Sequence, residues 1–484
     1  MINKNKTLTR ISIFNLIYYL ANALFPMIIS IYVSRIILPD GVGKVAYALN
    51  VASYFGALAS FGIPTYAARC IAQRKDNPTE KNRVFSQLFM MNAITTTIAT
   101  LLYIIYVSVT FIGGDLFLIV CAGTNILINY INIDWLFTGE EEYQFITIRS
   151  ITIKAISLLA VFSFVREKND YRVYALITSI TLCGNYLFNL VHAHKLVKFD
   201  FSDFEIKRHI KPVFYMSISV LLASIYNKID ITMLGVVSTN HIIGLYSNAH
   251  KIVGIVIDGI TAISTAFLPR LSFYYIHDKQ KFEDLIVKGL KITIFLAFPI
   301  AAGLFILAPQ TIEVLYGSEF APVSTTIRVF TPIILIKSIG MLVGFLPMMT
   351  SSNEKKRLPA ALLGCISNVI LNYLFLPLLY QNGAALASVL SEGLLCGYLF
   401  FAMRKIVFIT LPRDSFSQAL FTTICMGLIV WFITLLPINN LLKVIGGICI
   451  GIMVYSVENF MIRNEAMMFF IGKIAQTVKK EYFA

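Results

Sequence analysis

Long apolar runs separated by short charged loops recur along this whole sequence and limit its fold more than any other feature. A helix that crosses a membrane needs about 20 mostly apolar residues. Only helices and closed barrels satisfy their backbone hydrogen bonds in lipid, and runs of this length favour helices. Hydrophobic residues make up 57% of the 484 residues, and the mean hydropathy is +0.75. No water-soluble domain could bury that composition, so the sequence predicts an all-α integral membrane protein.

The runs predict about fourteen transmembrane helices. The first run follows a short basic leader, but it is too long for a signal-peptide core and lacks a small-residue cleavage site, so we interpret it as a retained span. The predicted spans are approximately residues 11–33, 45–66, 84–108, 116–138, 150–165, 173–192, 213–235, 243–268, 287–308, 326–349, 359–379, 384–402, 419–437 and 441–461.

Lysine and arginine are concentrated in alternate loops. The leader, the C-terminal tail and the loops after the second, sixth, eighth, tenth and twelfth predicted spans are rich in them, whereas the opposite loops are nearly bare. By the positive-inside rule both termini are cytoplasmic, which requires an even number of spans. This topology accounts for the formal net charge of +14, and we expect no nucleic acid partner.

A long polar connection at residues 192–212 divides the predicted helices into two groups. We predict an N-terminal six-helix lobe at 1–200, a C-terminal six-helix lobe at 201–405, and two additional transmembrane helices with a cytoplasmic tail at 406–484. A weak repeat supports the division, because the segment that begins at Gly43 aligns with the segment that begins at Gly244, 201 residues later. Repeats of the same orientation are typical of transporters with a central site between two lobes.

Charged residues within the apolar runs are the candidates for function. A lysine, arginine or aspartate at the centre of a membrane helix costs roughly 2.5–3.5 kcal/mol, so such residues usually face the bundle interior or a water-filled cavity. Lys228 and Lys251 are predicted at similar depths on neighbouring spans, with Asp230 and Asp258 close to them in the sequence. The other charged residues of this kind are Arg35, Arg328, Lys337 and Glu392.

We interpret these charges as the lining of a cavity for an anionic, amphipathic substrate that moves by alternating access. Cations in a low-dielectric wall attract an anion such as phosphate, and buried carboxylates can bind a coupling proton or sodium ion. The predicted substrate-binding residues are Lys228, Lys251, Arg35 and Lys337, and the predicted ion-coupling residues are Asp230, Asp258 and Glu392. The alternative is that these groups only form ion pairs between lobes, or that Arg35 and Arg328 reach toward the interface.

The sequence contains no Walker loop, GxSxG or HExxH motif and no clustered cysteine and histidine ligands, so we expect no catalytic residue, metal or cofactor, and no enzyme. The acidic cluster "TGEEEYQF" at 138–145 falls in a predicted cytoplasmic turn. We interpret it as a solvated loop.

Several segments resemble the polysaccharide transporter family, the O-antigen and capsule repeat-unit flippases of the multidrug/oligosaccharidyl-lipid/polysaccharide superfamily. They are "VSRIILPDGVGKVAYA" (33–48), "FGIPTYAARCIAQ" (61–73), "DWLFTGEEEYQFITIRS" (134–150), "NKIDITMLG" with "GLYSNAHKI" (227–252) and "FLPRLS" (267–272). Their order and spacing carry the resemblance over nearly the whole chain.

The resemblance implies two six-helix lobes around a central cavity, two additional helices, and a location in the bacterial cytoplasmic membrane. It implies that an oligosaccharide linked to undecaprenyl diphosphate is moved to the outer leaflet, with Lys228 and Lys251 near the diphosphate and the lipid tail in the bilayer. Partners would be membrane lipids, a coupling proton or sodium ion and a polysaccharide polymerase. Two alternatives are a cation-coupled multidrug exporter of the same superfamily and a membrane polysaccharide polymerase.

Overall fold

A computed structural model of the chain describes residues 2–110, 115–202, 205–351, 357–404 and 410–472. Within these ranges the chain is helical and contains no β-strand. Its contacts divide it into two compact units, residues 1–244 and 245–484, and each is described by itself. The predicted all-α membrane fold is confirmed, whereas the predicted lobe boundaries stay a prediction.

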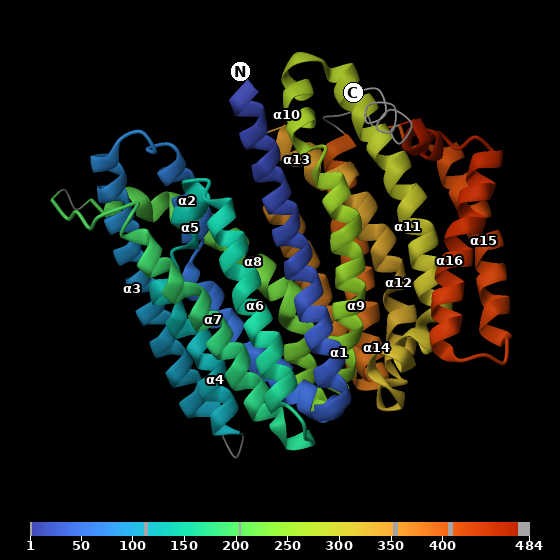
Figure 1. Cartoon of the computed structure of the whole chain (residues 1–484), viewed down its shortest axis with the longest axis horizontal. Coiled ribbons are helices and arrows are strands. Elements are labelled where there is room, and N and C mark those ends of the chain that lie inside the picture. Colours follow the sequence, from blue (N-terminus) through green and yellow to red (C-terminus); the bar gives the residue numbers. More distant parts are fainter. Residues whose placement is uncertain (1, 111–114, 203–204, 352–356, 405–409, 473–484) are drawn as a thin grey trace. The chain divides into compact units, whose positions relative to one another are not determined.

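The first unit is built around its first helical element, in which two helical segments meet at a sharp kink at Leu38. This helix, α1, packs against α3, α4, α6 and α8, and α2 packs against α3, α5 and α8 (Figure 1). The elements are α1 (Ile2–Ser60), α2 (Ile63–Ala72), α3 (Pro78–Thr110), α4 (Leu116–Leu127), η1 (Ile128–Ile131), α5 (Asp134–Gly139), α6 (Tyr143–Phe164), η2 (Lys168–Asp170), α7 (Tyr171–Ala193), α8 (Lys207–Val237) and the beginning of α9 (Asn240–Thr265).

The second unit is built around α11, which packs against α12, α15 and α16. Asp278 caps the start of α11, since its side chain accepts a hydrogen bond from the backbone N–H of Lys281. The elements after α9 are α10 (Leu268–His277), α11 (Lys279–Tyr316), η3 (Ser318–Phe320), α12 (Val323–Gly340), the π-helical turn η4 (Met341–Phe345), α13 (Leu346–Thr350), α14 (Arg357–Arg404), α15 (Arg413–Leu435) and α16 (Asn440–Met461).

Eleven helical segments of the described chain are long and apolar enough to cross a membrane. Two of them, within α1 and α14, contain a sharp kink where the sequence predicts two spans joined by a turn. The kinks lie at Leu38 (φ 59°) and Tyr380 (φ 46°). A further apolar helix, Leu116–Ile131, is shorter. Each of the two kinked segments corresponds to two predicted spans, and the short helix corresponds to one more. The eleven segments and the short helix therefore account for the fourteen predicted spans.

Two predicted spans end earlier than expected. The span predicted at 45–66 stops at Ser60, because Phe61 and Gly62 adopt positive φ angles and α2 then begins in a new direction. The span predicted at 116–138 stops at Ile131, and α5 follows as a separate short helix. Both short helices lie in one apolar core with α3, in which the side chains of Ile71, Phe85 and Phe137 are almost fully buried.

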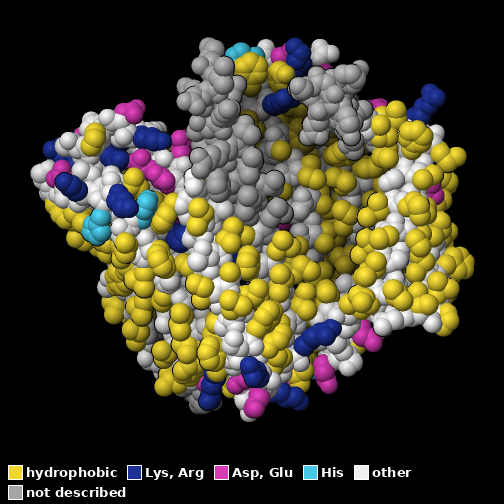
Figure 2. All heavy atoms as spheres, in the orientation of Figure 1, with side chains coloured by type: hydrophobic (Ala, Val, Ile, Leu, Met, Phe, Trp, Pro, Cys, Tyr) yellow, Lys and Arg dark blue, Asp and Glu magenta, His cyan; other side chains and the backbone are white. Residues whose placement is uncertain are grey.

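The surface distribution of side chains agrees with a membrane location. Hydrophobic side chains cover the flanks of the helices in each unit, and charged side chains gather at the helix ends (Figure 2). Exposed leucine, isoleucine and phenylalanine residues are numerous along α3, α15 and α16. Large exposed apolar areas of this kind are expected where lipid replaces water as the solvent.

Candidate functional site

Three of the predicted site residues lie in the first unit. Asp230 on α8 is buried, Lys228 on the same helix is half-buried, and Arg35 on α1 is exposed. The α1–α8 contact beside Lys228 is polar, because the Asn50 side-chain amide donates to the Lys228 carbonyl oxygen at 3.1 Å and to the Thr232 hydroxyl at 2.8 Å. Helix α8 is therefore fixed against α1 by hydrogen bonds at the depth of its charged residues.

The other four predicted site residues lie in the second unit. Lys337 on α12 forms an ion pair with the buried Glu392 on α14 (N–O distance 3.5 Å). Lys337 also acts electrostatically on Asp258 of α9. Lys251 and Asp258 are both exposed on α9. One lysine thus lies within electrostatic reach of two carboxylates that the sequence analysis assigns to ion coupling.

The two lysines that lead the sequence-based site fall in different units. Lys228 belongs to the first unit and Lys251 to the second. The predicted equal depth of the two ammonium groups, and their roles, stay a prediction. Among the described residues no group of three or more histidine, cysteine, aspartate or glutamate side chains is arranged to hold a metal ion.

A close backbone contact joins α1 to the start of α9 within the first unit. A β-carbon added to Gly43 would overlap the carbonyl oxygen of Asn240, and one added to Gly244 would overlap the carbonyl oxygen of Pro39. Only glycine permits so close an approach of two backbones. We call this the Gly43–Gly244 contact.

The Gly43–Gly244 contact is reciprocal in terms of the sequence repeat. The offset of 201 residues between the two glycines also separates Pro39 from Asn240. Each glycine therefore contacts the residue that precedes the other glycine by four positions. Such reciprocity is the pattern of a self-complementary contact around a two-fold axis.

The contact is flanked by an ion pair and by the α1 kink. Asp40 and His241, which the same offset relates, lie 3.6 Å apart (carboxylate oxygen to ring Nδ1). Leu38 has φ 59° and ψ 178°, a conformation used almost only by glycine. The sequence analysis did not identify these residues as functional, although the repeat that begins at the two glycines was a signal for them.

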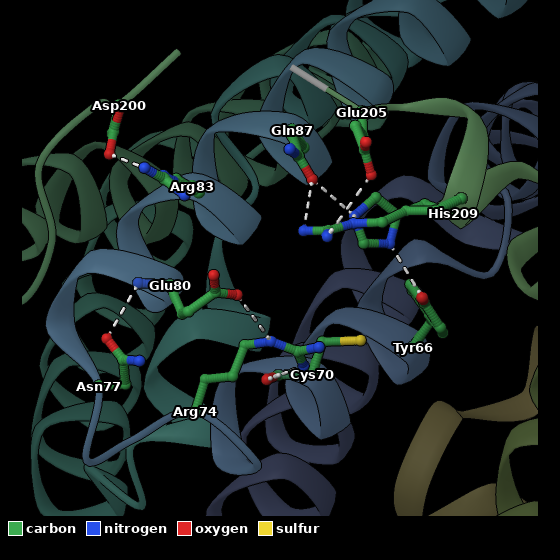
Figure 3. Close-up of polar contacts among 11 residues, drawn as sticks. Tyr66, Cys70, Arg74, Asn77, Glu80, Arg83, Gln87, Asp200, Glu205 and His209 are labelled. Carbon is green, nitrogen blue, oxygen red and sulfur yellow. Dashed lines mark hydrogen bonds and ion pairs between the residues drawn. The ribbon is translucent and has the colours of Figure 1, made fainter. Parts of the chain in front are cut away.

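A charged network covers the end of the first unit at α2, α3 and the start of α8 (Figure 3). His209 bridges two helices, since its ring nitrogens lie 2.9 Å from the Tyr66 hydroxyl and 2.8 Å from the Gln87 side-chain oxygen. The Arg74 guanidinium lies 3.8 Å from the Glu80 carboxylate. These basic residues, which the sequence assigns to the cytoplasmic side, are thus largely engaged in contacts within the unit.

The acidic segment after α5 is only in part the solvated loop that the sequence indicated, because one of its three glutamate side chains is buried. Glu140 accepts a hydrogen bond from the Lys81 ammonium at 2.8 Å, and both side chains are at most 10% exposed. Glu141 pairs with Lys75 at 3.1 Å in a much more exposed position. The sequence could not indicate the buried pair because the partners lie far apart along the chain and meet only when α5 packs near α3.

Asp134, at the start of the same segment, connects three helices. It accepts a 2.9 Å hydrogen bond from the buried Arg149 of α6 and a 2.6 Å hydrogen bond from the Asn189 amide of α7. Gly139 leaves room for Ile71 of α2, which a β-carbon would crowd. The "DWLFTGEEE" motif therefore stabilises the first unit and contacts no candidate substrate cavity described here.

The two acidic ion pairs lead to a prediction about stability. Lys81→Ala leaves Glu140 buried without its cation, so we expect a loss of about 3–5 kcal/mol in the free energy of unfolding. Lys75→Ala breaks the exposed pair and should cost at most about 1 kcal/mol. Thermal unfolding of the purified variants in one detergent measures both, and equal shifts in Tm would contradict the assignment.

An apolar groove runs along the second unit between α11, α15 and α16. It encloses about 590 Å³, and its lining includes Leu307, Val430 and Tyr455. Gly447 and Gly451 form a GxxxG pattern on α16 that lets this helix approach Leu307 and Val430 closely. The groove offers a surface for an acyl or isoprenoid chain.

The fold is that of the transporters and flippases of the MOP superfamily. The chain aligns with the lipid II flippase MurJ in an inward closed conformation at a TM-score of 0.75, with 16% identity over 93% of this chain and 99% of MurJ. It aligns with an inward-facing multidrug resistance MATE family transporter of the MOP superfamily at a TM-score of 0.65, with 16% identity over 79% of this chain and 94% of that chain.

Residues 8–274 match the family model described as polysaccharide biosynthesis protein, and the chain belongs to that family. A protein of Escherichia coli (strain K12) that carries the name O-antigen transporter is 22% identical over 83% of this chain and 98% of its own length. A Haloferax volcanii protein named as a low-salt glycan biosynthesis flippase is 22% identical over 50% of this chain and 52% of its own length.

Proposed function

We propose that this protein is a flippase for lipid-linked oligosaccharides in the bacterial cytoplasmic membrane. Its substrate would be a repeat unit of O-antigen, capsule or exopolysaccharide on undecaprenyl diphosphate, moved from the inner to the outer leaflet without covalent chemistry. The observation that carries the proposal is the match of more than half the chain to a polysaccharide biosynthesis family, joined to a transporter fold over 93% of its length.

The proposed substrate has three chemically different parts, an oligosaccharide, a diphosphate and a lipid tail. The chain offers a candidate surface for each of these parts. The ammonium groups of Lys228 and Lys251 and the guanidinium of Arg35 suit the diphosphate as positive charges. Lys228 and Lys251 carry ammonium groups, so their contact with phosphate would be that of point charges and not a bidentate fork. The apolar groove of the second unit suits part of the lipid tail.

Alternating access requires a contact that closes the outer side of the pathway and can open again. The Gly43–Gly244 contact suits that role because it is reciprocal between repeat-equivalent positions and each glycine approaches backbone atoms of the other segment. Its separation would also break the Asp40–His241 ion pair, which is partly exposed and therefore inexpensive to break. With both termini in the cytoplasm, this contact lies on the outer side.

Ion coupling is assigned to the second unit and to Asp230. One lysine and two carboxylates form this group, namely Lys337, Glu392 and Asp258. Its formal charge is −1, so uptake of one proton or one sodium ion would make the group neutral. Binding of that ion would weaken the ion pair between Glu392 and Lys337. The Lys337 ammonium group would then be available to the anionic substrate.

A second candidate function is cation-coupled drug export, which the MATE-like fold favours. The two functions differ in the charge of the cargo. A drug exporter moves compounds that are commonly cationic, which Lys228, Lys251 and Lys337 would repel, and we therefore favour the flippase.

Reconstitution tests the proposal. Purified protein in liposomes should move a defined undecaprenyl-diphosphate oligosaccharide between leaflets faster than protein-free liposomes, as measured by accessibility of the sugar to an external oxidant or lectin. Movement of a cationic dye, with no movement of the lipid-linked sugar, would instead support drug export.

Ion gradients give a prediction in the same liposomes. We expect a proton or a sodium gradient to accelerate flipping several-fold, and Glu392→Gln to remove that dependence because the amide cannot exchange a proton or carry charge. Lys443→Ala serves as the control, because it lies on α16, a helix that carries none of the predicted site residues. A gradient response that Glu392→Gln leaves unchanged would exclude Glu392 from coupling.

A further inference from the structure

A second cavity lies in the first unit, and its lining includes none of the charged residues assigned to the diphosphate. It encloses about 600 Å³ where α3 ends and where α4, α7 and α9 begin. Its wall combines tyrosines with charged groups of both signs. The lining residues that matter here are Lys44, Tyr47, Tyr106, Asp115, Tyr171 and Arg172.

The charged groups of this cavity are held in defined positions. The Asp115 carboxylate accepts hydrogen bonds from the Arg172 guanidinium at 2.8 Å and from the Tyr171 hydroxyl at 3.0 Å. The ammonium of Lys44 lies 4.6 Å from the centre of the Tyr171 ring, within range of a cation–π interaction. Burial raises the pKa of Asp115, but the bonds from Arg172 and Tyr171 outweigh it and hold this pKa below its ordinary value.

The aromatic wall is fixed as well. The buried Tyr103 donates a hydrogen bond from its hydroxyl to the Ile119 carbonyl oxygen at 2.9 Å, which ties α3 to α4. Tyr47 and Tyr106 also line the cavity and present an apolar ring with a polar end. A pocket of a few hundred Å³ with aromatic walls and a few placed polar groups has the general character of a small-molecule site.

We propose that this cavity binds an acidic sugar residue of the oligosaccharide. The tyrosine rings suit the C–H faces of a pyranose, and the Asp115–Arg172 pair suits its hydroxyl groups, as acceptor and donor. Two cations against one carboxylate leave a net positive charge, which suits a sugar carboxylate near Lys44. This inference rests on the proposed function and extends it to the sugar.

The cavity also borders the Gly43–Gly244 contact. Asn240, whose carbonyl oxygen meets Gly43, lines the cavity, and Lys44 and Tyr47 follow Gly43 by a turn or less on α1. Separation of that contact would move one wall of the cavity. A sugar bound there would lie beside the point at which the outer side opens.

The test uses two soluble disaccharides, cellobiouronic acid and neutral cellobiose, with the full-length protein in nanodiscs. Saturation-transfer NMR should detect the acidic disaccharide with an affinity at least fivefold higher than that of the neutral one. Lys44→Ala and Tyr106→Ala should each weaken its binding at least fivefold, and Lys44→Arg should retain it. Lys168→Ala, a matched change at an exposed lysine on η2 that does not line the cavity, should leave binding unchanged.

Three results would overturn the proposal. They are no binding of the acidic disaccharide at millimolar concentration, equal binding of it to the wild type and to Lys44→Ala, and binding of glycerol 3-phosphate without binding of either disaccharide, which would indicate a lipid headgroup site. If the variants do not fold, chemical acetylation of the wild-type protein decides the question. The acidic disaccharide should then protect Lys44 from acetylation, and no protection would overturn the proposal. Flipping of a lipid-linked oligosaccharide without disaccharide binding rejects only the sugar site, and disaccharide binding without flipping rejects only the proposed function.

Discussion

Replacement of Gly43 by alanine should abolish transport, with at least a tenfold loss of surface polysaccharide in a host that lacks its own flippase. The added β-carbon would overlap the carbonyl oxygen of Asn240, and a backbone atom cannot move aside as a flexible side chain can. Overpacking of this kind typically costs about 1–3 kcal/mol. Because the strain acts on the proposed outer closure, we expect the protein to favour the open outer state.

The same helix provides the control. Gly56→Ala places its methyl group in open space, and alanine favours a helix over glycine by about 1 kcal/mol, so this variant should keep full transport and equal or higher Tm. Gly244→Ala should reproduce the Gly43→Ala defect, and Gly254→Ala on α9 is its control because nothing lies near that position. Normal polysaccharide from Gly43→Ala at equal protein levels would reject the closure role.

Removal of both Lys228 and Lys251 is the second change with a large expected effect. A hydrogen bond to a charged group contributes roughly 1.5–3 kcal/mol, so loss of each ammonium should lower transport on the order of 10- to 100-fold. We therefore expect Lys228→Ala/Lys251→Ala to leave almost no surface polysaccharide. The measurement compares polysaccharide per amount of protein in the membrane.

Arginine substitutions separate charge from shape. Lys228→Arg/Lys251→Arg should retain activity if the lysines act as simple charges, and should lose it if the cavity requires the smaller ammonium. Lys75→Ala, which removes a cation from an exposed ion pair, controls for the loss of positive charge. Unchanged polysaccharide in the double alanine variant would show that these lysines do not bind the substrate.

The membrane fold could be predicted from the sequence because the length of an apolar run alone decides whether a helix can span lipid. Local backbone geometry could not be predicted in the same way. The sequence near Leu38 and Tyr380 predicts turns between separate helices, and the structure has a residue with non-helical backbone angles between two helical segments at each place, but the sequence does not indicate which residue takes that conformation. Hydropathy carries no information about a single unusual φ angle.

Ion pairs between residues that lie far apart in the chain could not be predicted from the sequence either. The acidic run around Glu140 has the composition of a solvated loop, and only packing of the α5 region near α3 buries it against Lys81. Lys337 and Glu392 were both identified as unusual charges, but their ion pair joins two helices that no sequence pattern links. The sequence indicated which charges are unusual, and the three-dimensional packing determined which of them meet.

The bend at Leu38 affects the energy difference between the two states of a transport cycle. A leucine in this conformation costs about 1–3 kcal/mol, which the surrounding contacts must offset. If Leu38 leaves this conformation when the neighbouring contact separates, that cost disappears and compensates for part of the interactions lost. The free-energy difference between the two states is then small. A substrate that binds one state only modestly better than the other can therefore shift the equilibrium toward that state.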